Sequence, residues 1–429
     1  MSMSKTQVKT ASVSNMQPVV GFIFLAGVIL LGANFLETEM LFFRLIVGLG
    51  LGYALSRAYT GFAGSINRAY TTGSTKLLRT LMFMFFISTL VTTAFLLNAD
   101  PTTFGLWINP INLGLIAGAI LFGFGMSFSA CCASGVLTDL VTALPRAFVT
   151  LIFFGMGVFL GFPIQRNSEF VTTTWFNSAT FEGGIFLPDL FKWDGLNGFI
   201  GALVLTAIFC GIVIFLSFKY ERYRKQNNTY SGHFVEAQQD QPSTFDTKDY
   251  SLFSSETYHR LFIRPWTLKQ GAVVITLIFA LLMGVTKSGW GASTPYGFWF
   301  GKVLMLFGFS AESLATFTSG APEHYSAPFF SHPINTQNVG IMLGTIFFLL
   351  TANKFKETFM SEMHLSKREL VLFALGGLAM GFGTRLANGC NVGALYTPIA
   401  QFSLSGWIFL IFMVVGGIVG NKFAKAWFK

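Results

Sequence analysis

Long, uninterrupted apolar stretches dominate this chain and restrict its folding to a lipid environment. Examples are residues 19–36, 77–97 and 198–218, and each is about as long as the 18 to 20 residues that a helix needs to cross the hydrocarbon of a bilayer. Charged residues make up 11% of the sequence and hydrophobic residues 52%, too apolar a composition for the surface of a soluble protein of 429 residues. Helices satisfy their own backbone hydrogen bonds in lipid, so the sequence predicts an all-α, polytopic membrane helix bundle.

Short clusters of basic residues between the apolar segments indicate the orientation of the chain. They lie at 57–79, 219–225 and 354–368 and in the C-terminal tail. Because basic loops stay on the cytoplasmic side, we expect both termini in the cytoplasm and the protein in a bacterial inner membrane. The net charge of +9 then reflects orientation, and no nucleic-acid partner is expected. The predicted spans are 19–36, 41–56, 77–97, 111–129, 146–162, 198–218, 271–286, 339–352, 369–387 and 404–420.

Polar segments divide the chain into five parts. The first span lacks the small-residue cleavage signature of a signal peptide, so we expect a retained helix. The segment that joins the two large apolar regions is polar and of mixed charge, which favours a solvated linker over a docking site for a partner. The predicted parts are residues 1–40, the N-terminal tail and first helix; 41–162, the first membrane repeat; 163–218, an external loop and connecting helix; 219–265, the cytoplasmic linker; and 266–429, the second repeat and basic tail.

One glycine-rich element occurs twice in the sequence. Cys390 follows Cys132 by 258 positions, and the same separation relates several glycines on both sides of these residues. A rare Cys and several Gly in one ungapped frame indicate an internal repeat. Five predicted spans separate the starts of the two units, and this odd number predicts that the second unit runs through the membrane in the opposite direction. The matched glycines are Gly118 with Gly376, Gly123 with Gly381, Gly125 with Gly383 and Gly135 with Gly393.

Each copy of the element has the composition of a broken helix. Inverted repeats commonly hold a substrate site near the bilayer midplane, where short discontinuous or re-entrant helices meet. An unwound turn exposes backbone N–H groups that an anion can satisfy, and half-helices that begin at Ala133 and Asn391 would direct their positive dipole ends toward the break. A thiol is a soft and weak hydrogen-bonding group. Such weak binding suits a permeation site.

The candidate permeation site consists of the polar residues and glycines around the two breaks. Symmetric placement favours a function for Cys132 and Cys390 over simple packing. Cys131 has Gly389 as its counterpart, and lining the path, packing, a vicinal disulfide and a metal site are its alternatives, although the His and carboxylate neighbours of a metal site are missing. Arg385 is interpreted as attracting an anion, the alternative being a snorkelling side chain. The full candidate set is Cys131, Cys132, Cys390, Arg385, Asn388, Asn391, Ser134, Gly125, Gly135, Gly383, Gly389 and Gly393.

Enzyme chemistry and ATP-driven transport find no support in the sequence. No carboxylate pair and no nucleophile–base arrangement recurs, so no catalytic residues are expected. A phosphate-binding loop is also missing, and neither a cofactor nor a metal is predicted. Cys210 lies within an uninterrupted apolar segment and is interpreted as a core residue.

The segment Gly383-Thr-Arg385-Leu-Ala-Asn-Gly389-Cys390-Asn-Val-Gly393, with its counterpart ending in Cys132-Ala-Ser-Gly135, resembles the signature of the YeeE/YedE family of sulfur-transport membrane proteins. The resemblance implies an inverted-repeat bundle with short helices dipping inward from both faces. It also implies thiosulfate uptake, with Cys132 and Cys390 passing the anion along by transient hydrogen bonds. Two features depart from the pattern: Cys131 precedes the first matched Cys where a Gly is expected, and the long linker resembles members associated with selenium.

Three functions follow from these observations, and a structural or assembly subunit without transport activity is the remaining alternative. The first is uptake of thiosulfate or a related small sulfur-containing anion through the lipid bilayer. The second is transport of a selenium compound. The third is a membrane sulfurtransferase partner, which would carry a persulfide on Cys131 or Cys132 and deliver it to a cytosolic sulfur-carrier protein.

Overall fold

The computed structural model describes residues 16–129, 131–240, 251 and 254–427. Within these ranges the secondary structure is helical apart from two isolated β-bridges. Nine helical segments of the described chain are long and apolar enough to span a membrane, and the shorter Leu113–Ser129 is also apolar. The prediction of a polytopic all-α bundle is therefore confirmed, and the chain is an integral membrane protein.

The helices agree with the predicted spans, but two of the observed helices are longer than the spans predicted for them. Spans predicted at 41–56 and 339–352 are the helices Glu39–Ala58 and Pro333–Thr351. The long helices are α1 (Met16–Phe35), α2 (Glu39–Ala58), α4 (Lys76–Leu96), α5 (Leu113–Ser129), α7 (Leu144–Asn167), α9 (Phe199–Gln226), α12 (Leu268–Thr286), α16 (Pro333–Thr351), α18 (Lys367–Leu386) and α20 (Leu404–Trp427). The shorter ones are α3 (Phe62–Thr72), α6 (Gly135–Thr142), α8 (Glu169–Thr172), α10 (Phe234–Gln239), α11 (Ser255–Tyr258), α13 (Thr294–Leu306), α14 (Ala311–Thr318), α15 (Glu323–Ser326), α17 (Phe355–Ser361) and α19 (Thr397–Ala400). Single-turn or irregular helices are η1 (Pro101–Thr103), η2 (Leu187–Asp194), η3 (His259–Ile263), η4 (Phe329–Ser331) and η5 (Asn391–Tyr396).

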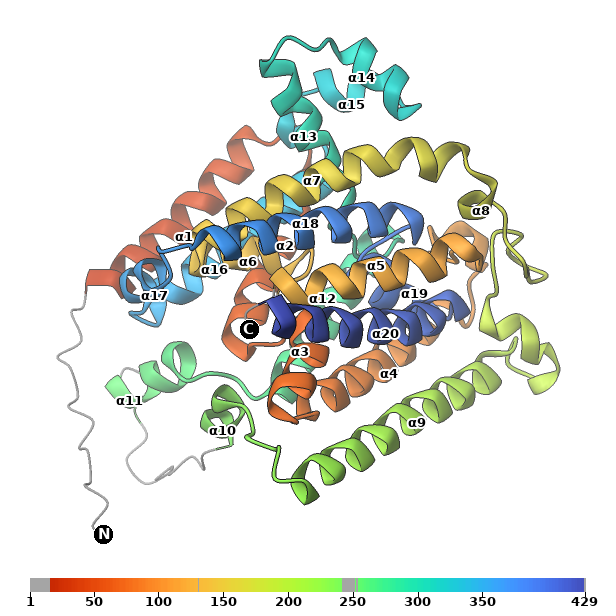
Figure 1. Ribbon diagram of the computed structural model, residues 1–429, viewed down its shortest axis with the longest axis horizontal. Coiled ribbons are helices and arrows are strands. Elements are labelled where there is room, and N and C mark those ends of the chain that lie inside the picture. The colour runs from red at the N-terminus through yellow and green to blue at the C-terminus, as the bar shows by residue number, and fades with distance from the viewer. Residues whose placement is uncertain (1–15, 130, 241–250, 252–253, 428–429) are drawn as a thin grey trace.

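Four central helices alternate between the two halves of the sequence. α7 packs against α18, α18 against α5, and α5 against α20, so first-half and second-half helices interleave (Figure 1). Farther out, α2 of the first half packs on α16 of the second, and α12 of the second half packs on α4 of the first. Each half therefore completes its packing with elements of the other half.

The contacts between central helices occur in reciprocal pairs. A side chain at Gly118 would overlap the carbonyl oxygen of Gly383, and one at Gly125 would overlap that of Gly376. Because Gly118 and Gly125 are the repeat counterparts of Gly376 and Gly383, the same contact is formed twice with the halves exchanged. Such reciprocity is the property of an interface around a two-fold axis, and it agrees with the predicted inverted repeat.

The next helices outward repeat this reciprocity. Gly157 of α7 lies against the carbonyl of Leu378, and Gly416 of α20 lies against the carbonyl of Ile120. Ile120 and Leu378 are again 258 positions apart. Small residues allow membrane helices to approach this closely.

Replacing either of these glycines by Ala is expected to destabilise the bundle. Gly157→Ala and Gly416→Ala each force a Cβ onto a carbonyl oxygen, and overpacking of this kind costs about 1–3 kcal/mol. Gly27→Ala and Gly211→Ala are matched controls, because nothing lies within 4 Å of a Cβ at these positions. Thermal unfolding in detergent should show a lower Tm for the first pair and an equal or higher Tm for the second. Equal Tm values in all four variants would contradict the proposed close packing.

One end of the bundle gathers the basic segments and the connection between the halves. Figure 1 shows α10, α11 and α17 at this end and α8 at the opposite end. Arg57 donates to the carbonyl oxygens of Arg264 and Arg260, at 3.1 and 2.8 Å, and Arg146 forms an ion pair with Glu362 at 3.6 Å. These contacts join loops that the sequence assigns to one side of the membrane.

Residues 231–240 of the predicted linker are partly exposed and are hydrogen-bonded to the bundle. The amide of Ser231 donates to the carbonyl of Thr72 at 2.9 Å, and the side-chain amide of Gln239 donates to the carbonyl of Ala58 at 2.9 Å. Composition suggested solvation because the segment is polar, but these polar groups find backbone partners at the ends of α2 and α3. The rest of the predicted linker includes 241–250 and 252–253, which lie outside the described residues, as does the tail 1–15.

Candidate functional site

The first break separates α5 from α6. α5 ends at Ser129, residues 131–134 are non-helical, and α6 begins at Gly135. The expected start at Ala133 is therefore two residues early. The hydroxyl of Tyr296 donates to the carbonyl oxygen of Ala133, so this carbonyl is engaged by another helix. Behind α6, Pro145 occupies the first turn of α7, where a missing N–H costs nothing.

The second break follows α18. Asn388 has φ 57°, a left-handed conformation that Asn tolerates better than most residues. Cys390 is extended, and the π-helical turn η5 begins at Asn391, the expected position. Gly389 lies against the backbone of Gly393 and Ala394, where a Cβ would come within 2.6 Å of the Ala394 nitrogen. Only glycine permits this close return of the chain.

The two breaks bring three thiols together around one tyrosine. Cys131, Cys132 and Cys390 are buried and free, and the sulfur of Cys132 lies 3.5 Å from the hydroxyl of Ser134. Tyr296 of α13 is close enough to interact electrostatically with all three cysteines, and Cys132 and Cys390 are close enough to interact with each other. Residues 258 positions apart in the sequence are thus neighbours in the fold.

Arg385 is buried beside the second break and its hydrogen-bond partners are neutral groups. Only 3% of its surface is exposed. Its guanidinium donates to the hydroxyls of Ser293 and Thr294 at 3.1 and 3.2 Å, to the amide oxygen of Gln165 at 3.3 Å and to the hydroxyl of Thr384 at 3.2 Å. Among the described residues no carboxylate lies within ion-pair distance of it. A full positive charge is therefore held inside the protein without a protein counter-charge.

Ser293 links this charge to the second thiol. The Ser293 hydroxyl and the backbone N–H groups of Val392 and Gly393 are close enough to the Cys390 sulfur to stabilise negative charge on it. Hydroxyl, amide and guanidinium donors thus converge near one sulfur atom. Donor groups of this kind bind small oxyanions, and bonds from a guanidinium to an anion are charge-assisted.

Two asparagines of the candidate set differ in their partners. Asn388 accepts from the side-chain amide of Gln165 at 2.7 Å, and Gln165 also accepts from Arg385, so the three side chains form one network. Asn391 donates to the sulfur of Met126 at 3.2 Å. Its side-chain oxygen is buried and has no hydrogen-bond partner among the described residues. An unsatisfied amide beside Cys390 adds a polar group to the break at a cost in stability.

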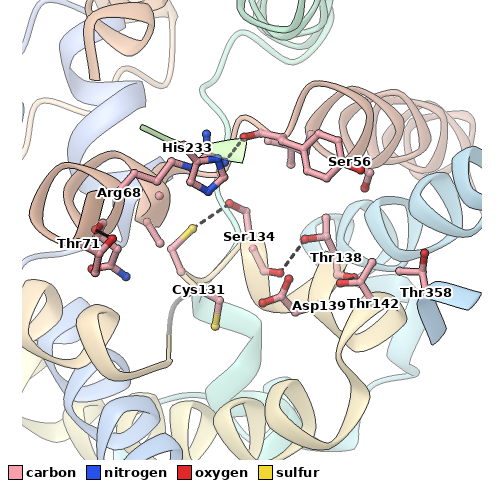
Figure 2. Close-up of a pocket in the computed structure, with 18 of the residues that line it drawn as sticks. Ser56, Arg68, Thr71, Cys131, Ser134, Thr138, Asp139, Thr142, His233 and Thr358 are labelled. Carbon is pink, nitrogen blue, oxygen red and sulfur yellow. Dashed lines mark hydrogen bonds between the residues drawn. The ribbon is translucent and has the colours of Figure 1, made fainter. Parts of the chain in front are cut away.

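A cavity of about 620 Å³ leads from the linker end of the bundle to the first break. Figure 2 shows Cys131 and Ser134 in its wall, with Arg68 and His233 on another side. Cys132 and Gly135 also line it, whereas Cys390 and Arg385 do not. The cavity thus reaches the first pair of thiols from one side, and the second break lies beyond it.

The second break is covered by the loop before α5. A Cβ at Gly393 would lie 2.8 Å from the Trp107 ring, and the Asn109 side chain donates to the Gly393 carbonyl at 3.4 Å. The backbone N–H of Trp107 donates to Gln401 at 2.8 Å. The indole therefore closes this side of the break in the present conformation.

Not every candidate residue lies at a break. Gly125 and Gly383 pack α5 against α18, as described above, whereas Gly135, Gly389 and Gly393 belong to the breaks. Sequence reasoning also missed four residues of the site: Ser293, Thr294, Gln165 and Trp107. The one available signal was the polar pair Ser293-Thr294 before an apolar run, which is typical of a helix start.

Comparisons with known proteins point to one family. A family model described as sulphur transport matches residues 57–419. Two proteins named "Probable transporter YedE", from Escherichia coli K12 and Salmonella typhimurium LT2, are each 29% identical to this chain. These matches cover 38% of this chain and 39% and 38% of the two relatives. A protein named "Thiosulfate transporter TsuA" from Spirochaeta thermophila is 25% identical over 72% of this chain and 76% of its own length.

Proposed function

This chain belongs to the sulphur-transport family, and from that premise we propose that it takes up thiosulfate or a closely related small sulfur-containing anion across a bacterial inner membrane. Members of the family are transporters and not enzymes. The inward direction, the cytoplasmic position of the linker and both termini, and the role of the thiols are parts of this proposal. The predicted parts 1–40, 41–162, 163–218 and 266–429 would supply its membrane helices, and the repeats at 41–162 and 266–429 would supply the breaks.

The uncompensated charge of Arg385 carries the proposal. A buried charge without a counter-charge costs several kcal/mol, and a packed ring, here Phe162 at 5.5 Å from the guanidinium carbon, offsets only about 1–2 kcal/mol of that cost. A doubly charged anion at the second break would supply the counter-charge. The oxygens of thiosulfate would accept from Arg385 and Ser293, and its terminal sulfur would face the thiol of Cys390.

The route follows the thiols. An anion held near Cys390 would pass to Cys132 by exchanging one weak S–H hydrogen bond for another, and would leave through the cavity that Cys131 and Cys132 line. Hydrogen bonds to a thiol are weak, so the anion is released instead of trapped. Trp107 would have to move aside to admit the anion from the opposite side.

A second function is favoured by the position of Cys131 and Cys132 in the wall of the open cavity. Attack of either thiolate on the outer sulfur of thiosulfate would break the S–S bond, release sulfite and leave a persulfide within reach of a sulfur-carrier protein at the linker end. Mass spectrometry of the purified protein separates the two mechanisms, because a hydrogen-bond relay leaves no lasting adduct and a sulfurtransferase leaves an added sulfur atom of about 32 Da. Transport of a selenium oxyanion would use the same donors, and competition experiments distinguish it.

Uptake into proteoliposomes tests the proposed substrate. We expect radiolabelled thiosulfate to enter protein-containing vesicles at least about fivefold faster than protein-free ones, since an unaided dianion crosses hydrocarbon very slowly. Unlabelled sulfate and selenite serve as competitors. Expression in a bacterial strain that lacks other sulfur importers should restore growth on thiosulfate. Uptake equal to that of protein-free vesicles, together with no growth, would rule out thiosulfate.

A further inference from the structure

The mouth of the cavity is partly built by the segment between the two halves. Residues 231–240, including α10, pack against α3, and His233 lines the same cavity as Cys131 and Cys132. Arg68 of α3 lies beside His233 in this wall and forms an ion pair with Glu236 at 3.3 Å. The linker therefore places one of its own carboxylates on Arg68, and Figure 2 shows Arg68 in the wall of the cavity that leads to the thiols.

Glu236 is held much more firmly than an ordinary surface carboxylate. It is 5% exposed, and besides Arg68 it accepts a hydrogen bond from the hydroxyl of Ser74. Asp240, four residues farther along the same segment, pairs with Lys76, but this carboxylate is largely exposed. Of these two linker acids, Glu236 is thus the one that neutralises a residue of the cavity wall.

His233 adds a second polar group to the mouth. Its Nδ1 atom is buried and has no hydrogen-bond partner among the described residues. Burial and the nearby charge of Arg68 hold the pKa of His233 below its ordinary value, so the ring is neutral at pH 7. One of its nitrogens then donates a hydrogen bond and the other accepts one. In the tautomer that carries its proton on Nδ1, His233 places an unpaired N–H donor beside the guanidinium, and such a donor can bond to a small oxyanion.

We propose that Arg68, Ser74 and His233 form an anion-binding station at the mouth of the cavity, and that the Glu236 carboxylate of the chain's own linker occupies this station in the present conformation. The station binds a small dianion when Glu236 leaves, and Glu236 displaces the anion when it returns. The linker thus competes with the transported anion for Arg68. The identity of that anion rests on the proposed function, whereas the competition for Arg68 does not.

Each part of the station has the chemistry that the exchange requires. The guanidinium of Arg68 keeps a second anchor, a bond to the carbonyl of Tyr59 at 2.8 Å, so it stays in place when Glu236 departs. The opposite wall of the cavity carries Asp139, whose charge is balanced by Arg146 at 3.0 Å. Freeing Arg68 therefore makes the mouth more positive, and a positive mouth raises the local concentration of anions.

Thiol labelling tests the station without any transport measurement. Purified protein in lipid nanodiscs carries Cys210→Ala and Cys390→Ala, which leaves Cys131 and Cys132 as its thiols. The rates of modification by an anionic and a cationic methanethiosulfonate of similar size are followed by intact-protein mass. Glu236→Gln is expected to raise the anionic-to-cationic rate ratio about three- to tenfold. Asp240→Asn removes the same charge from the same segment, and its ratio should stay within about twofold of the parent because Arg68 remains paired.

Two further measurements make the result specific to Arg68. Adding Arg68→Gln to Glu236→Gln should return the ratio to that of the parent, and inorganic sulfate should slow labelling only when Arg68 is present and unpaired. A ratio in Glu236→Gln equal to that in Asp240→Asn overturns the station. Should Glu236→Gln elute as an aggregate, Glu236→Asp, whose shorter side chain weakens the pair, is measured instead and must also raise the ratio. Failure of thiosulfate uptake with a raised ratio would overturn the proposed substrate and leave the station standing.

Discussion

Arg385→Gln is expected to lower the initial rate of thiosulfate uptake about a hundredfold or more while raising the thermal stability of the protein. Each charge-assisted hydrogen bond to an anion contributes about 1.5–3 kcal/mol, and the variant loses at least one such bond together with the buried charge. Gln remains able to bond to the hydroxyls of Ser293 and Thr294. Removing an uncompensated buried charge relieves its desolvation cost, so the Tm should rise. Uptake into proteoliposomes and thermal unfolding in detergent measure the two effects.

Arg166 provides a matched control for this change. It lies in the last turn of α7, and its guanidinium also packs on the ring of Phe162, at 5.0 Å. It donates to the carbonyl of Thr318 at 2.7 Å. It lies close enough to Arg385 to repel its charge, and none of the hydrogen bonds described for the second break involves it. Arg166→Gln should keep most of the uptake. A fall in Tm for Arg385→Gln, with uptake retained, would show that Arg385 is a structural residue.

The repeat explains why the centre of the fold could be predicted from the sequence. An ungapped frame that matches Cys132 with Cys390 and Gly118 with Gly376 already fixes which helices are equivalent, and the reciprocal glycine contacts follow once the halves are antiparallel. The start of η5 at Asn391 also agrees with the expectation. The equivalence of the helices can be read from a single sequence, because both copies of the repeat contain the same kinds of residues in the same order.

The neighbours of the site could not be predicted in the same way. Ser293 and Thr294 reach Arg385 across about ninety positions, and Trp107 covers Gly393 from almost three hundred positions away. These residues come from elements outside the glycine-rich repeat. Sequence periodicity predicts helices but does not predict which loop will contact which break. The docking of the linker similarly rests on contacts between residues far apart in the sequence, such as the pair of Arg68 and Glu236, which composition does not reveal.

Glycine was the least specific of the sequence signals. Gly125 and Gly383 belong to the same motif as Gly135 and Gly393, yet the first two pack helices together and the last two lie at the breaks. Membrane helices use glycine both for close packing and for interruption of the helix, so the residue type alone does not separate the roles. Position relative to the matched Cys does, because Gly125 and Gly383 lie seven residues before Cys132 and Cys390, whereas Gly135 and Gly393 follow them by three.

The double variant Cys132→Ala/Cys390→Ala is expected to lower thiosulfate uptake about a hundredfold, and each single variant about tenfold. Each of the two thiols contributes one weak hydrogen bond to the anion, worth on the order of 1 kcal/mol. The relay needs both thiols in turn. Replacement by Ser keeps a donor of similar size and should recover part of the rate in each single variant. Initial rates of radiolabelled uptake, corrected for the amount of protein in the vesicles, provide the measurement.

Cys210→Ala is the internal control for loss of a buried thiol. Cys210 lies on α9, and its sulfur donates to the carbonyl of Met82 on α4 at 3.5 Å. Because this thiol belongs to neither break, uptake by the variant should be unchanged. Cys131→Ala separates the two functions that the cavity allows, because the relay through Cys132 and Cys390 tolerates it whereas a persulfide carried on Cys131 does not. Uptake at the parental rate in both Cys132→Ala and Cys390→Ala would exclude the thiol relay and would leave Arg385, with its hydroxyl partners, as the whole of the anion site.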